Sequence, residues 1–264
     1  PLLSKYRSNT YEPCHYHTFL SMKLITIPSY LTDIGNHSFC NYSSVTEIRV
    51  HSSVKSIGFN AFNDCFSLKT ITFDETDPIK IIEKNTFKNC KSLEMIKIPS
   101  NVVIIKDYAF DGCSKLSEII IPQTVKSFES HAFNGCTSLK RIKTVYSVTK
   151  GDTQSFKSTI GAGCFKNFIS LEEVCIPSSI SEIGYEAFYG CYSIKNLTLG
   201  KQLQYIGSSA FYECRMIPNI IEIPETITYI GKYSFYNLPN LGPVLTIKNV
   251  KYIGTSAFHN CIGL

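Results

Sequence analysis

The sequence predicts a β-rich repeat solenoid, and three observations favour that fold class. A phenylalanine recurs ten times at nearly constant spacing, apolar residues keep fixed positions around it, and an alternation of apolar and outward residues follows it in most copies. The successive spacings are 23, 25, 23, 23, 32, 23, 23, 24 and 23 residues, and a period in this range is typical of a stacked array. The anchors are Phe39, Phe62, Phe87, Phe110, Phe133, Phe165, Phe188, Phe211, Phe235 and Phe258.

Each repeat is expected to contain two extended pieces. The first precedes the anchor, as in Val54-Lys55-Ser56-Ile57, and in seven copies it ends at a glycine four residues before the anchor, which indicates a turn. The second follows the anchor, where pairs such as Ile96 and Ile98 show the period of two expected of a half-buried strand. A proline often closes this piece, and because proline lacks an N–H it suits a strand end.

Four columns of the repeat are expected to form the core. These are the anchor itself, the apolar residue five positions before it, the small residue directly before it, and the aliphatic residue six positions after it. A single coil is too small to bury its own apolar side, so stacked coils must share one continuous core. The small residue fits this arrangement because a large side chain would clash where coils pack closely.

A fifth column, three residues after the anchor, holds most of the eleven cysteines. Other copies place Tyr42, Phe168 or Leu238 there, so the slot is apolar and favours buried free thiols. A disulfide ladder is the alternative, but parallel Cβ vectors about 4.7–5 Å apart exceed the ~3.8 Å that a bridge favours. A metal site at Cys14-His15-Tyr16-His17 lacks a second cluster with zinc-like spacing. The column comprises Cys65, Cys90, Cys113, Cys136, Cys191, Cys214 and Cys261.

The pattern Ile-Gly, two residues, Ala-Phe, two residues, Cys, two residues, Leu, two residues, Ile, one residue, Ile-Pro resembles the BspA-type, or Treponema-type, leucine-rich repeat. Residues 105–122 and 183–199 show most of it, and the resemblance covers about residues 20–264. The sequence departs from it at Glu83, Lys106 and Glu129, which replace the glycine. The resemblance implies a β-rich α/β solenoid, a leucine-rich-repeat horseshoe of about ten 23-residue coils with a parallel sheet on the concave face.

The regular pattern predicts one elongated domain. Residues 1–18 are polar and irregular and are expected to form an N-terminal segment or cap, while 19–264 form the solenoid. The spacing of 32 residues places an inserted loop at about 144–160. Insertions in solenoids map to loops, often on a binding face, and a tolerated surface insertion is the plainer interpretation.

Composition and motifs exclude several classes of function. The net charge is only +5 and the Lys and Arg residues are scattered, so we expect no nucleic-acid partner. No apolar run approaches the ~18 residues of a membrane helix, so we expect no membrane insertion within 1–264. No Gly-x-Ser-x-Gly motif, phosphate-binding glycine loop or recurring carboxylate pair occurs, which predicts a non-enzyme without cofactor or metal. The chain begins at Pro1 and stops at Leu264 before a strand, so self-association through uncapped ends is expected.

The strand residues that face away from the core are the candidate binding residues. Ten strands would align them into a broad surface of the kind with which solenoids bind proteins. Exposed Met95 and Ile120 favour binding over the alternative, a plain solvated sheet face, because a polar residue would serve there equally well. The expected centre of this face comprises Met95, Lys97, Glu118, Ile120, Arg141, Lys143 and Glu173.

Two functions remain open at this point. The resemblance implies a surface protein that binds a protein partner through the concave face, in adhesion. The alternative is an intracellular structural or scaffold component of a large assembly, in the cytoplasm. Unpaired cysteines favour the second, because oxidising compartments tend to pair them.

Overall fold

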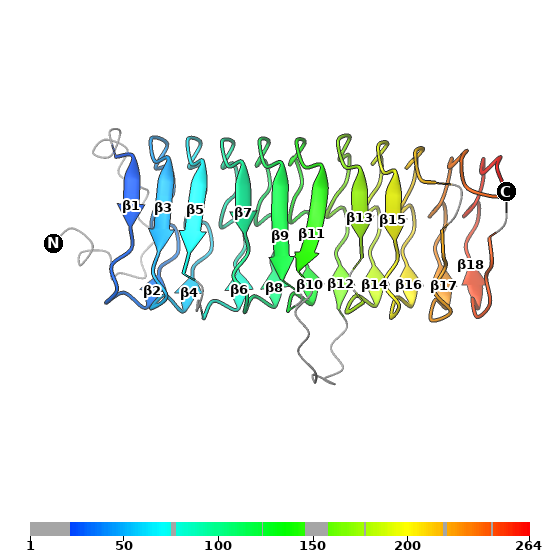
Figure 1. Ribbon diagram of the computed structural model, residues 1–264, viewed down its shortest axis with the longest axis horizontal. Coiled ribbons are helices and arrows are strands. Elements are labelled where there is room, and N and C mark those ends of the chain that lie inside the picture. Colours follow the sequence, from blue (N-terminus) through cyan, green and yellow to red (C-terminus); the bar gives the residue numbers. More distant parts are fainter. Residues whose placement is uncertain are drawn as a thin grey trace.

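The chain is an elongated parallel β-solenoid of about nine turns, each of about 23 residues, in a computed structural model (Figure 1). The structure describes residues 22–74, 78–122, 124–145, 158–176, 178–218, 221–243 and 245–264, with the backbone alone at 141 and 143–145. These ranges contain no helix. The α/β label and the count of ten coils are therefore not confirmed, and the expected segment 1–18 lies outside the described residues.

The longer strands form one layer of the solenoid, seen as the upper row in Figure 1. Apart from β1, each begins eight residues after an anchor phenylalanine. The predicted alternation is clear in β5 and β7, where Ile71 and Ile96 are buried while Thr70 and Met95 are exposed. The strands are β1 (Leu24–Thr26), β3 (Glu47–Val50), β5 (Thr70–Phe73), β7 (Met95–Lys97), β9 (Glu118–Pro122), β11 (Arg141–Val145), β13 (Glu173–Cys175) and β15 (Asn196–Thr198).

Two-residue strands form the second layer, the lower row in Figure 1. Each ends on the apolar residue five positions before the anchor, which is buried in all but the last coil. These strands are β2 (Asp33–Ile34), β4 (Ser56–Ile57), β6 (Ile81–Ile82), β8 (Ile104–Ile105), β10 (Ser127–Phe128), β12 (Thr159–Ile160), β14 (Glu182–Ile183), β16 (Tyr205–Ile206), β17 (Tyr229–Ile230) and β18 (Tyr252–Ile253).

A stack of anchor rings runs through the core between the two layers. The centroids of successive rings lie 5.1–5.5 Å apart, and their planes differ by no more than 15°. All anchors except Phe258, in the last coil, are buried. Because each aromatic side chain removes a large apolar area from water, this stack dominates the core energetics.

Both layers are interrupted at one coil junction. The long strands form a three-stranded sheet β1-β3-β5 and a five-stranded sheet β15-β13-β11-β9-β7, and the short strands form a pair β2-β4 and an eight-stranded sheet from β18 to β6. We call this junction, between β4 and β5 on one side and β6 and β7 on the other, the seam. It coincides with the spacing of 25 residues between Phe62 and Phe87. Turn hydrogen bonds still cross it, since the Phe62 N–H donates to the Thr86 carbonyl at 2.9 Å.

The predicted insertion at 144–160 is shorter than expected at both ends. Strand β11 continues to Val145 and β12 begins at Thr159, because residues 144 and 145 pair with Ile121 and Pro122 of β9, and Thr159 pairs with Ser127 of β10. Residues 146–157 lie outside the described part of the chain. The ladders stay intact across this insertion, with Ile142 opposite Val174 and Phe128 opposite Ile160.

In the last two complete coils, the described residues do not form the long strand that the sequence predicts. No strand is assigned within 221–228 or 245–251, although Ile221 is buried and Ile247 is half-buried as the apolar pattern requires. Pro218 and Pro243 precede these segments. Because proline has no N–H, it removes a ladder donor where the strand would begin.

Two positions per coil, two residues before and two after the anchor, adopt the left-handed backbone conformation. Sixteen non-glycine residues there have φ between 53° and 64°, and asparagine is the commonest of them. Asparagine tolerates this region better than most residues. The sequence pattern did not predict this role, which His37 and His131 also fill. Both are half-buried, and His131 stacks on Tyr108 with ring centroids 5.2 Å apart.

The glycine four residues before the anchor marks a close approach between coils. A Cβ on Gly161 would lie 2.7 Å from the Phe128 carbonyl oxygen of the preceding coil. Three consecutive coils replace this glycine with charged residues that bond to one another's coils. The Lys106 Nζ lies 3.0 and 2.9 Å from the two Glu83 carboxylate oxygens, and Glu129 accepts the Asp107 N–H at 3.2 Å.

Candidate protein-binding face

The outward sides of β7, β9, β11 and β13 bring the predicted binding residues together. The parallel register sets Met95, Glu118, Arg141 and Glu173 opposite one another in one row across the four strands. A second row, two residues further along the strands, contains Lys97, Ile120 and Lys143. The backbone therefore gathers all seven predicted residues into one patch, which we call the sheet face.

The described side chains of the sheet face are mixed in character. Met95 is 54% exposed, Lys97 and Glu173 are exposed, and Glu118 and Ile120 are half-buried. Methionine is enriched at protein interfaces, where its flexible thioether adapts to the partner surface. The positions of the Arg141 and Lys143 side chains lie outside the described residues.

The sheet face is narrower than the sequence suggests. Sequence reasoning expected ten aligned strands with this patch at the centre, whereas the five-stranded sheet begins at β7, directly beside the seam, and ends at β15. Met95 and Lys97 therefore lie on an edge strand. Ile220 and Val244, which follow the same outward pattern in later repeats, lie outside the described part of the chain.

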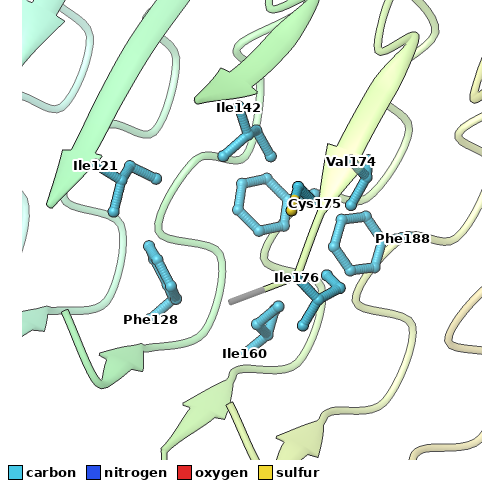
Figure 2. Close-up of a pocket in the computed structure, with 9 residues that line it drawn as sticks. Ile121, Phe128, Ile142, Ile160, Val174, Cys175, Ile176 and Phe188 are labelled. Carbon is cyan, nitrogen blue, oxygen red and sulfur yellow. The ribbon is translucent and has the colours of Figure 1, made fainter. Parts of the chain in front are cut away.

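The recess at the base of the insertion is not a ligand site. Figure 2 shows its apolar lining, in which Ile142, Ile160 and Val174 surround the space. Its volume is about 10 Å³, which is about what a single water requires. Strand β11 pairs with β13 through two residues only but with β9 through five, and the small void lies where β11 and β13 stop pairing.

The cysteine column is a set of buried free thiols, as predicted. Each thiol also donates a hydrogen bond to the anchor carbonyl of the preceding coil, at 3.0–3.3 Å between Sγ and O. Burial raises the pKa of the Cys65 thiol to about 12, so the reactive thiolate is suppressed at neutral pH. The position therefore favours cysteine for its S–H donor as well as for its size. The sequence did not predict this hydrogen bond, because other copies place apolar residues at the same position.

The described residues offer little for other chemistry. No group of three or more metal-ligating side chains occurs within them, and Cys14 with its neighbouring histidines lies outside them. Within the same ranges, no helix is long and apolar enough to cross a bilayer.

Comparison with known proteins identifies the family. The sequence model described as "BspA type Leucine rich repeat region", in six copies, matches residues 9–140, 76–160 and 158–264. The chain therefore belongs to the BspA-type leucine-rich repeat family. A comparison with curated protein sequences gives no significant match.

Solved structures of similar fold come from several bacteria. The leucine-rich repeat protein TpLRR of T. pallidum aligns with a TM-score of 0.53 and 20% identity, over 75% of this chain and 79% of that one. A leucine rich cell surface protein from Faecalibacterium prausnitzii A2-165 is 23% identical over 92% and 86%, with a TM-score of 0.39. The pneumococcal vaccine antigen PcpA is 22% identical over 89% and 69%, with a TM-score of 0.49. The likeness to TpLRR concerns the fold alone.

Proposed function

We propose that the chain is a non-catalytic protein–protein interaction module that acts at a cell surface, in adhesion. It binds its partner through the sheet face, on the concave side of the expected horseshoe. The observation that supports this most is Met95, which is 54% exposed on an edge strand among charged residues. Repeat solenoids use extended sheet surfaces in this way, and members of the family are often surface proteins.

The partner is expected to carry acidic groups. Lys97 is exposed on β7, and the register places Arg141 and Lys143 two strands away on β11, beside the acidic Glu118 and Glu173. Basic residues at the rim of an interface accelerate association with an acidic surface and make it sensitive to salt. The association rate should therefore fall as ionic strength rises.

The second candidate is an intracellular structural or scaffold component of a large assembly. One observation favours it, since all the described cysteines are free thiols. In an oxidising compartment cysteines tend to pair.

A charge-reversal comparison tests the binding face. The variant Lys97→Glu, Arg141→Glu, Lys143→Glu should lose the partner in pull-downs while its melting temperature stays close to wild type, because surface changes alter stability little. The matched control Lys84→Glu, Lys232→Glu, Lys251→Glu makes the same change in charge at exposed positions away from the sheet face and should retain the partner. Equal recovery by both variants would place the interface elsewhere and favour the structural assembly.

A further inference from the structure

We propose that the groove between β4 and β6, at the seam, binds a small oxyanion such as a carboxylate, sulfate or phosphate group. The groove has a volume of about 420 Å³ and is lined by Lys55, Lys80, Ile81 and Glu83 among others. It lies on the short-strand layer and does not depend on the sheet face. Its donors are backbone amides and lysine side chains.

The amides come from the broken ladder. In intact coils the residue at the position of Glu83 donates its N–H to the preceding coil, as Gly58 does to Ile34 at 2.8 Å and Lys106 to Ile82 at 2.9 Å. The residue at the position of Lys80 does the same, as Val103 donates to the Lys80 carbonyl at 2.7 Å. Within the described chain, the amides of Lys80 and Glu83 have no such acceptor.

We infer the direction of these two amides from their equivalents in the intact coils. Their equivalents are directed at the neighbouring coil, and at the seam that direction leads into the space between β4 and β6. Backbone N–H groups that converge on one concavity can bind an anion, because each of them is an obligatory hydrogen-bond donor. An oxyanion would supply the acceptors that the carbonyls of Lys55 and Ile57 supply in a regular ladder.

Two ammonium groups add positive charge to the same groove. Lys55 and Lys80 both line it, and neither forms an ion pair in the described structure. Hydrogen bonds from charged donors to an oxyanion are roughly twice as strong as neutral ones. The two lysines therefore supply attraction while the amides fix the geometry.

Among the described residues, three acidic groups near the groove already have hydrogen-bond partners. The Glu83 carboxylate is held by Lys106 through both of its oxygens. Asp33 accepts the Ser56 hydroxyl at 2.5 Å, and Asp74 accepts the Ser52 N–H at 2.9 Å. Lys106 offsets the charge of Glu83, whereas Asp33 and Asp74 keep their charge beside neutral donors. The attraction for an oxyanion therefore comes from Lys55 and Lys80, which line the groove itself.

The test is an NMR titration of the full chain with inorganic sulfate, acetate and glucuronate, at ionic strength held constant with sodium chloride. The account predicts saturable shifts at the amides of Lys80 and Glu83 with at least one of the three anions. The amides of Val103 and Lys106, whose ladder bonds are intact, should not shift. Shifts that never saturate, or that spread evenly over exposed lysines, would overturn the proposal.

Two variants distinguish a built site from general charge. Lys55→Ala with Lys80→Ala should weaken binding at least tenfold, whereas Lys84→Ala with Lys251→Ala should leave it unchanged. Deleting Glu75 and Thr76 returns the spacing to 23 and should close the seam and abolish binding. Because that deletion removes a negative charge, an effect of charge alone would strengthen binding instead. Circular dichroism confirms folding, and if the deletion variant does not fold, the lysine pair decides.

Discussion

Two insertions at the same corner of the coil have opposite effects on the solenoid. Both fall between a long strand and the next short strand, where the spacing is 25 residues between Phe62 and Phe87 and 32 between Phe133 and Phe165. The longer insertion leaves both layers paired, while the shorter one interrupts both. The size of an insertion is therefore a poor guide to the damage that it does.

The difference follows from whether the extra residues can leave the coil. Nine added residues are enough to depart from β11 and return to β12, and closing a longer loop costs little more entropy. A connection that is only two residues longer has less freedom to form a separate loop, and the ladders are interrupted where the spacing is 25 residues. The turn side is unaffected in both places, with anchor rings 5.5 Å apart across the seam and 5.2 Å apart across the insertion.

Thiol labelling should show the largest difference, that between the native and the denatured protein. It reports on the turns that carry the anchor and cysteine columns, at the seam and at the insertion. Cys65, beside the seam, has its pKa raised by burial to about 12 from about 9, so at pH 8 its thiolate fraction is lowered roughly a thousandfold. Burial also raises the pKa of the Cys136 thiol, which lies beside the insertion. Both should label slowly in the native protein and rapidly in denaturant. Fast native labelling of Cys65 alone would show that the seam opens on the turn side as well.

Removing the side chain of an anchor phenylalanine should have the next largest effect, a loss in the free energy of unfolding. Phe87→Ala and Phe133→Ala should each lower the free energy of unfolding by about 3–5 kcal/mol, as large core truncations do. The two variants should differ in the cooperativity of unfolding. Among the described residues no strand pairing crosses the seam, so the coils on its two sides are coupled by the stacked anchor rings and the hydrogen bonds between turns, without the ladders. Calorimetry should show two transitions for Phe87→Ala and one for Phe133→Ala. Identical single transitions would mean that the seam does not weaken coupling.

Returning each spacing to 23 residues is the matched deletion experiment. Removing residues 75–76 should raise the free energy of unfolding by about 1–3 kcal/mol, because it restores inter-coil hydrogen bonds worth about 0.5–1.5 kcal/mol each. Removing residues 147–155 should change it by less than about 1 kcal/mol, because those ladders are intact already. Urea denaturation measures both. The account fails here if the longer deletion has the larger effect.

Sequence reasoning predicted the parts of the fold that repeat. The core columns, the alternation around Ile96 and the buried thiols follow from residue type at fixed spacing, and a column averages over ten copies. The candidate face was predicted as a set of residues, and the register then placed them in two rows.

The features that sequence reasoning missed occur once or depend on backbone geometry. The seam arises from two residues whose effect depends on how a corner accommodates them. The absent strand after Pro218 was signalled by the proline, but the apolar pattern at Ile221 and Ile223 outweighed it. The left-handed positions do have a signal in recurrent asparagines such as Asn60 and Asn85, but these residues belong to no chemical motif.

Amide hydrogen exchange tests the central claim, that two extra residues open the ladder at the seam. The amides of Lys80 and Glu83 should exchange at least about a hundredfold faster than those of Val103 and Lys106, their equivalents in the next coil, because unpaired amides exchange without an opening step. The Gly161 amide, which donates to the Phe128 carbonyl at 2.6 Å across the longer insertion, should be as slow as Lys106. Equal protection of Glu83, Lys106 and Gly161 would contradict the account.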